Sequence, residues 1–425
     1  MSKMNGKEIQ MKYDIRDITL APYGHKKIEW VRDHMPLLRN LEDEFLKTKP
    51  FDGVKISLSV HLEAKTAYLC KVLAAGGAQM SITGSNILST QDDVCAALVE
   101  DGLSVFAYHD ADEEQYFKHI EMCLECKPNI VIDDGCDLVS CLHDKRPDLA
   151  EEMWGGCEET TTGIQRLRAL DKEGKLMFPM MAVNDAKCKH LFDNRYGTGQ
   201  STWDSIMRNT NLVIAAKTVV VAGYGWVARG IAMYAKNLGA QVIVTEIDPV
   251  KAIEAKMDGF SVMKMEQAAP LGDIFCTATG DIKTVNTDHM MMMKNGAILT
   301  NSGHFNTEID MPGLYEIAVE RKPRRNNVEA FKLPNGRWID VIADGRLVNI
   351  AGADGHPAEI MDTSFAVQAF GALYINENKD KLEKHLLSIP DEIDNKIAFK
   401  KLEAWGIEID TLTEEQTNYI NSWRL

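Results

Sequence analysis

Short apolar runs alternate with amphipathic helical patterns through the first third of the chain. Strands are expected at 54–60, 80–83, 103–108 and 129–133, and helices at 62–75, 92–99 and 116–126. This alternation predicts a mainly parallel sheet with helices on both faces. Polar residues such as Asp133 and Asp134 follow the strands, at the sheet edge where such folds bind ligands.

A second strand-and-helix unit begins at a buried run, Val219-Val-Val-Ala222, that leads directly into Gly223-x-Gly225-x-x-Ala228. Gly223 permits a tight turn, Gly225 lets backbone amides approach a pyrophosphate, and Ala228 allows close helix–strand packing. The following helix offers unpaired N–H groups and a positive dipole end to phosphates. The sequence therefore predicts a dinucleotide site, although a glycine-rich turn in another α/β protein remains an alternative.

An acidic residue selects between the two nicotinamide dinucleotides. The next strand, 241–245, ends at Glu246, about 20 residues beyond Gly225, where a carboxylate accepts hydrogen bonds from the ribose hydroxyls. A carboxylate there repels a 2′-phosphate, so NAD is expected rather than NADP.

The rest of the pattern completes an α/β fold with two doubly wound parallel-sheet domains. Further strands are expected at 274–277 and 297–300, a strand pair with an Asn-Gly turn at 331–340, a polar connector at 193–201 and a helix at 357–376. The expected division is a substrate-binding domain at 1–190, a Rossmann NAD-binding domain at 200–352, a return to the substrate-binding domain at 353–392, and a small C-terminal helical tail at 393–425 that contacts another subunit.

Composition narrows the class of protein. The net charge of −16 argues against nucleic-acid binding, which needs excess Lys and Arg. No apolar stretch is long enough to span a bilayer, and the polar N-terminus lacks a signal-peptide core. Nine scattered cysteines indicate reduced thiols and a cytoplasmic protein. Cys123 and Cys126 are interpreted as one helix rather than half a zinc site, and no metal is expected.

Seven further motifs occur in order along the chain. They are Asp133-Asp-Gly-Cys-Asp137, Glu158-Glu-Thr-Thr-Thr-Gly163, Val183-Asn-Asp185, Phe192-Asp-Asn194, Gly303-His-Phe305, Gly345-Arg-Leu-Val-Asn349 and Gly355-His-Pro357. Together with the Gly223 loop they resemble the S-adenosylhomocysteine hydrolase (adenosylhomocysteinase) family over nearly the whole chain.

The resemblance implies a hydrolase that works by oxidation and reduction. One tightly bound NAD per subunit takes a hydride from the ribose C3′ of a nucleosidyl homocysteine, and the ketone makes the C4′ proton acidic. Loss of that proton expels homocysteine from C5′, water adds, and the hydride returns. The resemblance also implies a homo-oligomer, with a tetramer favoured.

It further implies the catalytic residues. Lys189 deprotonates the 3′-hydroxyl, for which its pKa is expected to be lowered. Asp193 and Asn194 hold this lysine and the sugar. The remaining implied catalytic residues are Asp134 and Glu159 around the ribose, and His61 and His304, which move protons at the leaving group and water. Without the resemblance, a surface lysine in a lysine-rich stretch is the favoured interpretation of Lys189, and Asp134 and Glu159 are equally well a strand end and a helix cap.

Two sets of binding residues follow from the same resemblance. The implied cofactor contacts are Thr160, Thr161, Thr162, Asn194, Gly223, Gly225, Trp226, Val227, Glu246, Asn301 and Asn349. The implied substrate contacts are Glu63, Lys65, Thr66, Asn194, His356, Met361 and Phe365. Asn349 is expected to serve the nicotinamide amide, which needs both a donor and an acceptor.

Three departures from the better-known eukaryotic pattern matter. In His61-Leu-Glu63-Ala-Lys65, the glutamate and lysine suit adenine and hypoxanthine equally, a variant also found in S-inosylhomocysteine hydrolases. Thr198 replaces a cysteine, so no thiol redox role carries over. The ending Ser422-Trp-Arg-Leu425 lacks a Lys- and Tyr-containing peptide, so faster NAD exchange is expected.

Two other functions stay open at this stage. One is an NAD-dependent dehydrogenase of a small hydroxy acid, which shares the two-domain plan and releases NADH at each turnover. The other is a non-catalytic NAD-sensing protein, against which the presence of all the implied catalytic residues argues.

Overall fold

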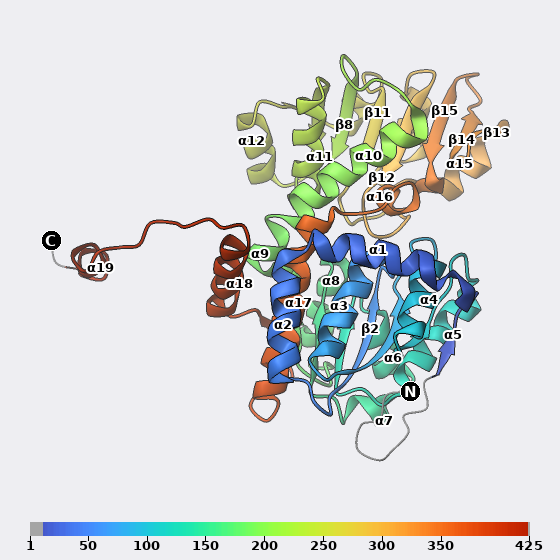
Figure 1. Cartoon of the computed structure of the whole chain (residues 1–425). Helices are drawn as coiled ribbons and strands as arrows, with labels where there is room; N and C mark the ends of the chain where they lie inside the picture. Colours follow the sequence, from blue (N-terminus) through green and yellow to red (C-terminus); the bar gives the residue numbers. More distant parts are fainter. Residues whose placement is uncertain (1–11, 424–425) are drawn as a thin grey trace.

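The computed structural model describes residues 12–423. The chain forms two α/β bodies, each built on an eight-stranded sheet, and a C-terminal arm that extends away from both (Figure 1). Expectations that concern residues 1–11, among them the polar N-terminus, and residues 424–425 at the end of the tail lie outside the described residues.

The first sheet is wholly parallel, in the order β1-β4-β3-β2-β5-β6-β7-β16. Its strands are β1 (Tyr13–Asp14), β2 (Lys55–Val60), β3 (Gln79–Gly84), β4 (Ser104–Phe106), β5 (Ile130–Asp133), β6 (Gly155–Glu158), β7 (Met180–Ala182) and β16 (Leu386–Ser388). Ile130 and Ile132 pack into the core on one face and Val131 into the core on the other. Continuous burial on both faces explains why these strands are apolar runs rather than alternating patterns.

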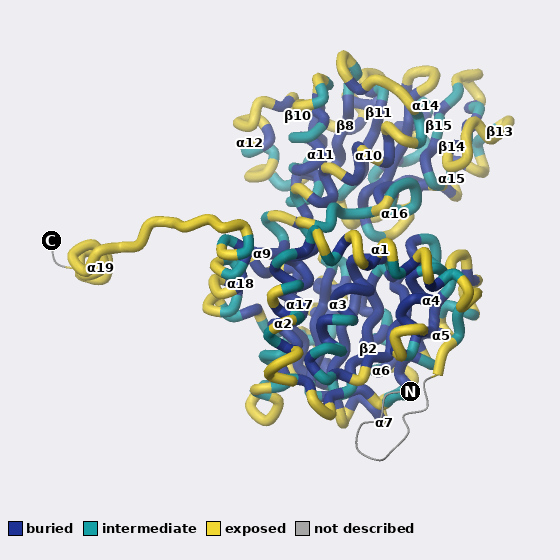
Figure 2. The backbone as a smooth tube through the Cα atoms, viewed as in Figure 1, coloured by how far each residue is buried: buried dark blue, intermediate teal, exposed yellow. Residues whose placement is uncertain are grey.

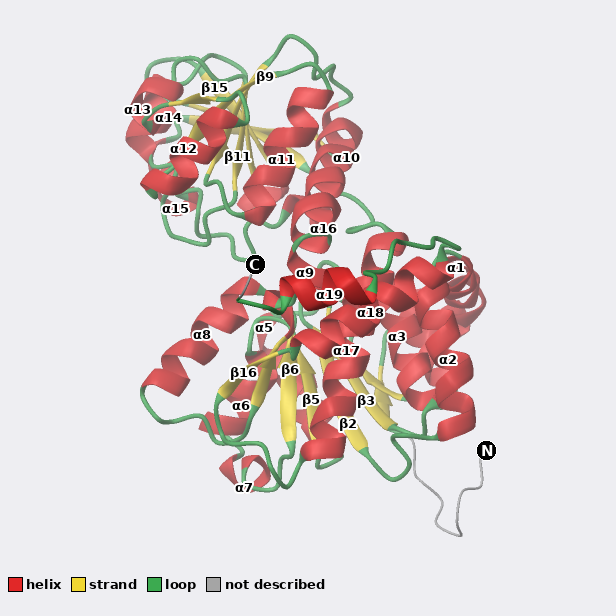
Figure 3. Ribbon diagram, turned by 90° about the vertical axis from the view of Figure 1, so that its left-hand side faces the viewer, coloured by secondary structure: helices red, strands yellow, loops and turns green. Residues whose placement is uncertain are grey.

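Helices cover both faces of this sheet (Figure 3). One face carries α1 (Ala21–Asp33), α2 (Pro36–Thr48), α3 (Ala64–Ala75), α4 (Asp92–Glu100), α17 (Ala358–Asn378) and α18 (Asp391–Ala404). The other carries α5 (Glu113–Leu124), α6 (Asp137–Asp144), α7 (Pro147–Ala150) and α8 (Thr161–Lys172). The long helix α17 therefore brings the end of the chain back to the first body.

The second sheet has the order β10-β9-β8-β11-β12-β15-β14-β13 and is parallel except for the hairpin strands β14 and β13. Its strands are β8 (Thr218–Ala222), β9 (Gln241–Thr245), β10 (Ser261–Val262), β11 (Ile274–Thr277), β12 (Ala297–Asn301), β13 (Glu320–Arg325), β14 (Val328–Lys332) and β15 (Trp338–Ile342). The Asn-Gly turn predicted between 331 and 340 joins β14 to β15. The exposed edge strand β13 was not predicted, because it is Glu-Arg-Lys-Pro-Arg-Arg and has no apolar pattern.

Helices also cover the second sheet on two faces. One core contains residues of α10 (Thr198–Thr210), α11 (Trp226–Asn237), α12 (Pro249–Met257) and α16 (Val348–Ala351). The other contains α13 (Met265–Ala268), α14 (Thr287–Met292) and α15 (Met311–Ile317). Both sheets are thus doubly wound, as the pattern predicted.

The segment expected as a polar connector at 193–201 is helical, and that prediction was wrong. Residues Asp193–Gly197 form a π-helix that runs into α10, following the short α9 (Lys187–His190). Asp and Gly have low helix propensity, but Asp193 and Asn194 are buried, Asp193 accepts a hydrogen bond from the distant Ser364, and Asn194 accepts one from Lys189. Tertiary contacts therefore override the local preference, and π-turns of this kind are frequent at functional sites.

The predicted tail divides into two parts. Helix α18 packs on the first body, where Lys401 pairs with the buried Asp362 at 2.6 Å, so the expected limit at residue 393 falls inside a docked helix. Beyond it, an exposed stretch leads to α19 (Glu414–Ile420) (Figure 2). Contact of this arm with another subunit stays a prediction.

Candidate active site

A cleft of about 1760 Å³ lies where the carboxyl ends of the two sheets face each other. Its wall contains every residue expected to bind cofactor or substrate, and every expected catalytic residue, except Asn301. Parallel strands end at the same edge of their sheet, so residues far apart in sequence meet there.

Lys189 is at the centre of a buried polar cluster. It lies on α9 with its Nζ 3.1 Å from Asp193 Oδ2 and 3.4 Å from Glu159 Oε1. It also donates to the side-chain oxygens of Asn194 at 2.8 Å and Asn184 at 3.3 Å. The alternative of a surface lysine is therefore wrong: its side chain is 6% exposed.

The expectation of a lowered pKa for Lys189 was also wrong. Burial acts to lower the pKa of Lys189, but Asp193 and Glu159 outweigh burial and raise it. Burial acts to raise the pKa of Asp193, but Lys189 and His356 outweigh it, and the net change is downward. Burial raises the pKa of Glu159 to about 8, against a lowering by Lys189. Near neutral pH the cluster therefore contains an ammonium, a carboxylate and a protonated acid.

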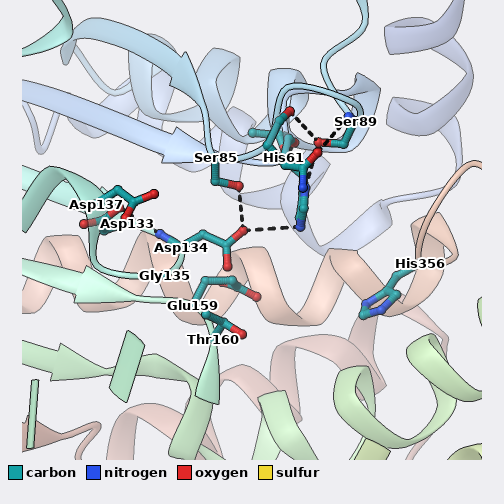
Figure 4. A network of polar contacts seen from close by, with 12 residues as sticks. His61, Ser85, Ser89, Asp133, Asp134, Gly135, Asp137, Glu159, Thr160 and His356 are labelled. Atoms are coloured by element: carbon teal, nitrogen blue, oxygen red, sulfur yellow. Dashed lines mark hydrogen bonds and ion pairs between the residues drawn. The ribbon is translucent and has the colours of Figure 1, made fainter. Parts of the chain in front are cut away.

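His61 and Asp134 form a second group in the same cleft (Figure 4). His61 Nε2 is 3.6 Å from Asp134 Oδ2, and His61 Nδ1 is 2.7 Å from the Ser89 hydroxyl. The Ser85 hydroxyl donates to the same Asp134 oxygen at 2.8 Å. Burial lowers the pKa of His61, against a rise caused by Asp134, so its imidazole is neutral near pH 7 and available to accept a proton.

His304 approaches this group from the second body. Its ring lies 6.4 Å from that of His61, and a Cβ on Gly135 would sit 2.9 Å from His304 Nε2. Asn301 holds this loop, because its amide donates to the carbonyls of Gly303 and Phe305 and its oxygen accepts from Gly303 N. Asn301 thus supports the histidine loop from outside the cleft wall, and its expected contact with the cofactor stays a prediction.

Glu63 and Lys65 form an ion pair of 2.7 Å on the cleft wall. Glu63 also caps α3 by accepting the backbone N–H of Lys65, and Lys65 Nζ donates to the carbonyl of Asp354 at 3.1 Å. Thr66 is tied to the carbonyl of His61 at 2.6 Å. A carboxylate acceptor and an ammonium donor therefore lie side by side on the cleft wall.

His356 connects the two bodies. Its Nδ1 contacts Asp193 and its Nε2 lies 3.1 Å from the Thr198 hydroxyl of α10. The hydroxyl that replaces the expected cysteine therefore has a partner of its own.

The Gly223 loop is shaped for a dinucleotide. Gly223 has a φ of 95°, and a Cβ there would be 2.8 Å from the carbonyl of Ala278, so the turn itself requires glycine. Gly225 has an ordinary φ of −70°, and a Cβ at this residue would meet no atom within 4 Å. The turn does not need glycine at 225, and the open space in front of it fits a pyrophosphate at the start of α11.

Glu246 and Asn349 fit the two ends of the same ligand. The Glu246 carboxylate accepts the backbone N–H groups of Tyr224 at 2.6 Å and Ile247 at 2.7 Å, which fixes it beside the loop for ribose hydroxyls. Asn349 donates to Ser201 at 3.1 Å, while its buried Oδ1 has no partner among residues 12–423. The Thr162 hydroxyl is likewise buried and unpaired in that part of the chain. Both atoms are available to an amide or hydroxyl of a bound NAD.

Sequence reasoning missed two supports on α17. Gln368 donates to Glu159 Oε2 at 2.5 Å, and Ser364 donates to Asp193 Oδ2 at 2.9 Å. Both are fully buried in the middle of a helix that is buried on all sides. A buried Gln in such a helix was the signal available in the sequence, since buried polar groups need partners.

All nine cysteines are free thiols, and burial raises the pKa of Cys123 to about 12. Cys123 lies near the end of α5 and packs in the core, whereas Cys126 lies in the turn beyond the helix, so the one-helix interpretation was right for Cys123 only. Within residues 12–423, no group of three or more His, Cys, Asp or Glu side chains is arranged to hold a metal ion. No helix in that range is both apolar and long enough to cross a membrane.

Comparison with known proteins gives the family. The family model described as S-adenosyl-L-homocysteine hydrolase matches residues 12–148, and the one for its NAD binding domain matches residues 194–355. Adenosylhomocysteinase of Pyrococcus abyssi is 55% identical over 412 residues, which are 97% of this chain and 98% of that protein.

S-inosyl-L-homocysteine hydrolase of Methanocaldococcus jannaschii is also 55% identical over 412 residues, covering 97% of this chain and 99% of that protein. Adenosylhomocysteinase of Aquifex aeolicus is 53% identical over 416 residues, covering 98% of this chain and 100% of that protein. This chain is therefore a member of the S-adenosyl-L-homocysteine hydrolase family and carries the family's NAD-binding domain.

Proposed function

We propose that this protein hydrolyses S-adenosyl-L-homocysteine reversibly to adenosine and L-homocysteine. One observation carries the proposal: the Lys189 cluster and the His61–Asp134 group face the Gly223 loop across a single cleft. A sugar held there contacts proton-transfer groups on one side and the nicotinamide on the other.

NAD⁺ supplies the hydride acceptor for the sugar C3′ and, once reduced, the hydride donor that ends the cycle. The chain's own residues handle the protons. Lys189 gives its proton to solvent when the ligands bind and then accepts the proton of the 3′-hydroxyl, and Asp193, 3.1 Å away, stabilises the ammonium that forms again. Asn194 and His356 hold the two partners in place during this exchange.

The elimination step needs a base at C4′ and an acid at the leaving sulfur. Asp134 is the candidate base, and His61 and His304 are placed to move protons at C5′. Glu159 is a protonated acid near neutral pH, so it donates a hydrogen bond to the ribose. The low exposure of the cluster limits the access of water to the sugar.

The Glu63–Lys65 pair favours a second candidate, hydrolysis of S-inosyl-L-homocysteine by the same mechanism. With adenine, the N6 amine donates a hydrogen bond to Glu63, and N1 accepts one from Lys65. With hypoxanthine, O6 accepts a hydrogen bond from Lys65, and N1–H donates one to Glu63. Relatives named for either substrate are equally similar to this chain, so identity does not decide between them.

Turnover of the two thioethers by the purified protein decides the substrate. We expect release of free thiol from the adenosyl compound, without accumulation of NADH, and slower turnover of the inosyl compound. A kcat/KM higher for the inosyl compound would assign the second candidate. Steady growth of NADH absorbance would instead indicate a dehydrogenase, and absence of thiol from both compounds would reject the proposal.

We also infer a cytoplasmic homo-oligomer, with a tetramer favoured. The support is the arm beyond α18, whose apolar side chains Ile407, Ile409, Leu412 and Ile420 are all about half exposed or more. Apolar side chains in a row on an extended arm suit a protein surface. Light scattering of the full chain and of a chain ending at Gly406 tests this, and equal particle sizes would contradict it.

A further inference from the structure

Two carboxyl groups, Asp133 and Glu158, lie directly behind the active site. They face each other in register at the ends of the parallel strands β5 and β6, and both are fully buried. Each precedes an implied catalytic residue, Asp134 and Glu159, by one position. Neither takes part in the mechanism described above.

The hydrogen bonds of the two carboxyl groups differ. Both oxygens of Asp133 accept backbone N–H groups, from Asp134 at 3.0 Å and from Val139 at 2.9 Å. In Glu158 a single oxygen, Oε1, accepts two, from Gly135 at 2.9 Å and Thr160 at 3.0 Å. The other oxygen of Glu158, Oε2, is buried and has no hydrogen-bond partner within residues 12–423.

The difference in hydrogen bonding indicates which of the two carboxyl groups carries a proton. A carboxyl group whose two oxygens both accept N–H groups, as in Asp133, suits the ionised form. A carboxyl group with one buried oxygen that accepts nothing, as in Glu158, suits the protonated form. Two neighbouring buried carboxyls do not both ionise near neutral pH. Burial raises the pKa of both carboxyl groups, so the pair keeps a proton near neutral pH, and the hydrogen bonds place that proton on Glu158.

The surrounding groups leave this pair without a cation of its own. The titratable groups that face it are Asp134, Asp137, Cys136, Tyr116 and Arg166. The Arg166 guanidinium donates to the carbonyl of Gly135 at 2.7 Å and to Asp137 at 3.3 Å. The guanidinium therefore forms its hydrogen bonds with neighbours of the pair and not with Asp133 or Glu158.

A glycine keeps room for the Glu158 side chain. A Cβ on Gly163 of α8 would lie 2.1 Å from the Glu158 carboxyl carbon. The carboxyl thus sits against the first turn of the helix that begins after Thr160, and it ties that turn to Gly135 through one oxygen.

We propose that Asp133, as the carboxylate, and Glu158, as its protonated partner, are positioning residues that hold the Asp134–Gly135 turn and Thr160 in register for the reaction. This role rests on the function proposed above for Asp134 and Thr160. The pair joins a proton-transfer residue to a cofactor-binding residue through four backbone N–H groups.

The test uses two isosteric substitutions in the full chain loaded with NAD. E158Q keeps the acceptor Oε1 and puts a donor where the proton lies, so we expect kcat within about threefold of the wild type. D133N turns a donor toward a backbone N–H, so we expect kcat to fall by about 100-fold, with KM for the thioether changed by less than about threefold.

The pH dependence of unfolding supplies a readout that does not depend on the reaction. A raised folded pKa gives stability that is present below the unfolded pKa of Glu158 and is lost as the pH rises through the folded value. Denaturant midpoints of the wild type are therefore expected to fall between about pH 5 and pH 8, and this fall is expected to be smaller in E158Q. Glu152→Gln, on an exposed residue that precedes β6, is the control and is expected to keep the wild-type slope.

The outcomes separate this proposal from the proposed function. Wild-type protein that releases no thiol rejects the function. Active wild-type protein with equal losses of kcat in E158Q and D133N, or an E158Q slope that matches the wild type, overturns the assignment of the proton to Glu158.

Discussion

The two sheets build their halves of the cleft in opposite ways. The first sheet ends in buried charged side chains that contact one another, with Lys189 within 3.4 Å of two carboxyls. The second sheet ends in glycine and backbone, with open space in front of Gly225. The first half performs proton transfer and needs fixed side chains, whereas the second half holds a ligand and needs room and unpaired N–H groups.

The two halves also differ in how far apart their parts are in the sequence. The dinucleotide loop and Glu246 come from one continuous segment, joined by the bond from Tyr224 N to Glu246. The Lys189 cluster draws Glu159 from β6–α8, Asp193 from the π-helix and Gln368 from α17. A change in the first half is therefore expected to affect rate, and a change in the second half to affect cofactor binding.

The largest expected effect is on the first half. Lys189→Ala is expected to lower kcat by at least about 1,000-fold, because it removes the group that exchanges the 3′ proton. Folding and NAD content, measured by thermal unfolding and by chromatography of released nucleotide, are expected to stay near the wild type. Lys187→Ala, two residues away and exposed, is the control and is expected to keep full activity. Loss of NAD together with rate would contradict the division of labour between the halves.

Gly223 and Gly225 of the second half are needed for different reasons, Gly225 for the space that a ligand occupies and Gly223 for the backbone conformation of the turn. Gly225→Val is expected to weaken NAD binding by about 100-fold, which corresponds to ~3 kcal/mol, because its side chain fills the space meant for phosphate. Its unfolding free energy is expected to change by less than about 1 kcal/mol. Gly223→Ala is expected to cost about 2 kcal/mol of stability instead, since the left-handed turn and the Ala278 carbonyl reject a Cβ.

Isothermal titration with NAD and denaturant unfolding measure the two quantities. If Gly225→Val bound NAD normally, the space in front of residue 225 would not be the phosphate site.

How far apart the parts of each half lie in the sequence also decides which of them can be predicted from the sequence alone. The Gly223 loop, Glu246 and the strands around them follow from local pattern, because turn geometry and strand burial are properties of adjacent residues. Lys189 carried no local signal beyond a lysine-rich stretch, and only the family resemblance singled it out. Its raised pKa depends on Asp193 and Glu159, whose distance to it is set by the packing of three separate elements.

Other errors have related physical causes. The segment 193–201 is helical because Asp193 and Asn194 are buried and hydrogen-bonded to Ser364 and Lys189, which overrides their turn preference. Gln368 and Ser364 were missed because a helix buried on every side gives no periodic pattern. Edge strand β13 was missed because its residues are charged, a common feature of exposed edges.

A smaller effect is expected from a residue outside the cleft that supports the first half. Asp394 of α18 accepts the backbone N–H groups of Lys187 at 2.8 Å and Cys188 at 3.0 Å, and so caps the short helix that carries Lys189. Asp394→Ala is expected to cost about 1 kcal/mol of stability and to lower kcat about tenfold by releasing α9.

The conservative variant and a neighbour make this test specific. Asp394→Asn keeps one acceptor oxygen and therefore accepts one of the two N–H groups, so it is expected to restore part of the rate. Asp391→Ala removes only an exposed pair with Lys187 and is expected to change stability by less than about 0.5 kcal/mol. Equal activities of the Ala and Asn variants at residue 394 would show that α9 does not depend on this cap.

The smallest expected effect concerns the neutral histidine of the first half. Burial lowers the folded pKa of His61, so the unfolded chain binds a proton at this residue at a higher pH than the folded chain does. Stability from this group is therefore present above about pH 6.5 and lost as the pH falls through the lowered folded pKa. Urea unfolding at pH 5 and pH 7 is expected to show a smaller difference in His61→Gln than in the wild type.

The control is His25→Gln, on the surface helix α1, which is expected to leave the wild-type difference in place. An unchanged difference in His61→Gln would mean that His61 is not held neutral by burial. In that case only the Lys189 cluster would support the contrast between the buried first half, which performs proton transfer, and the open second half, which holds a ligand.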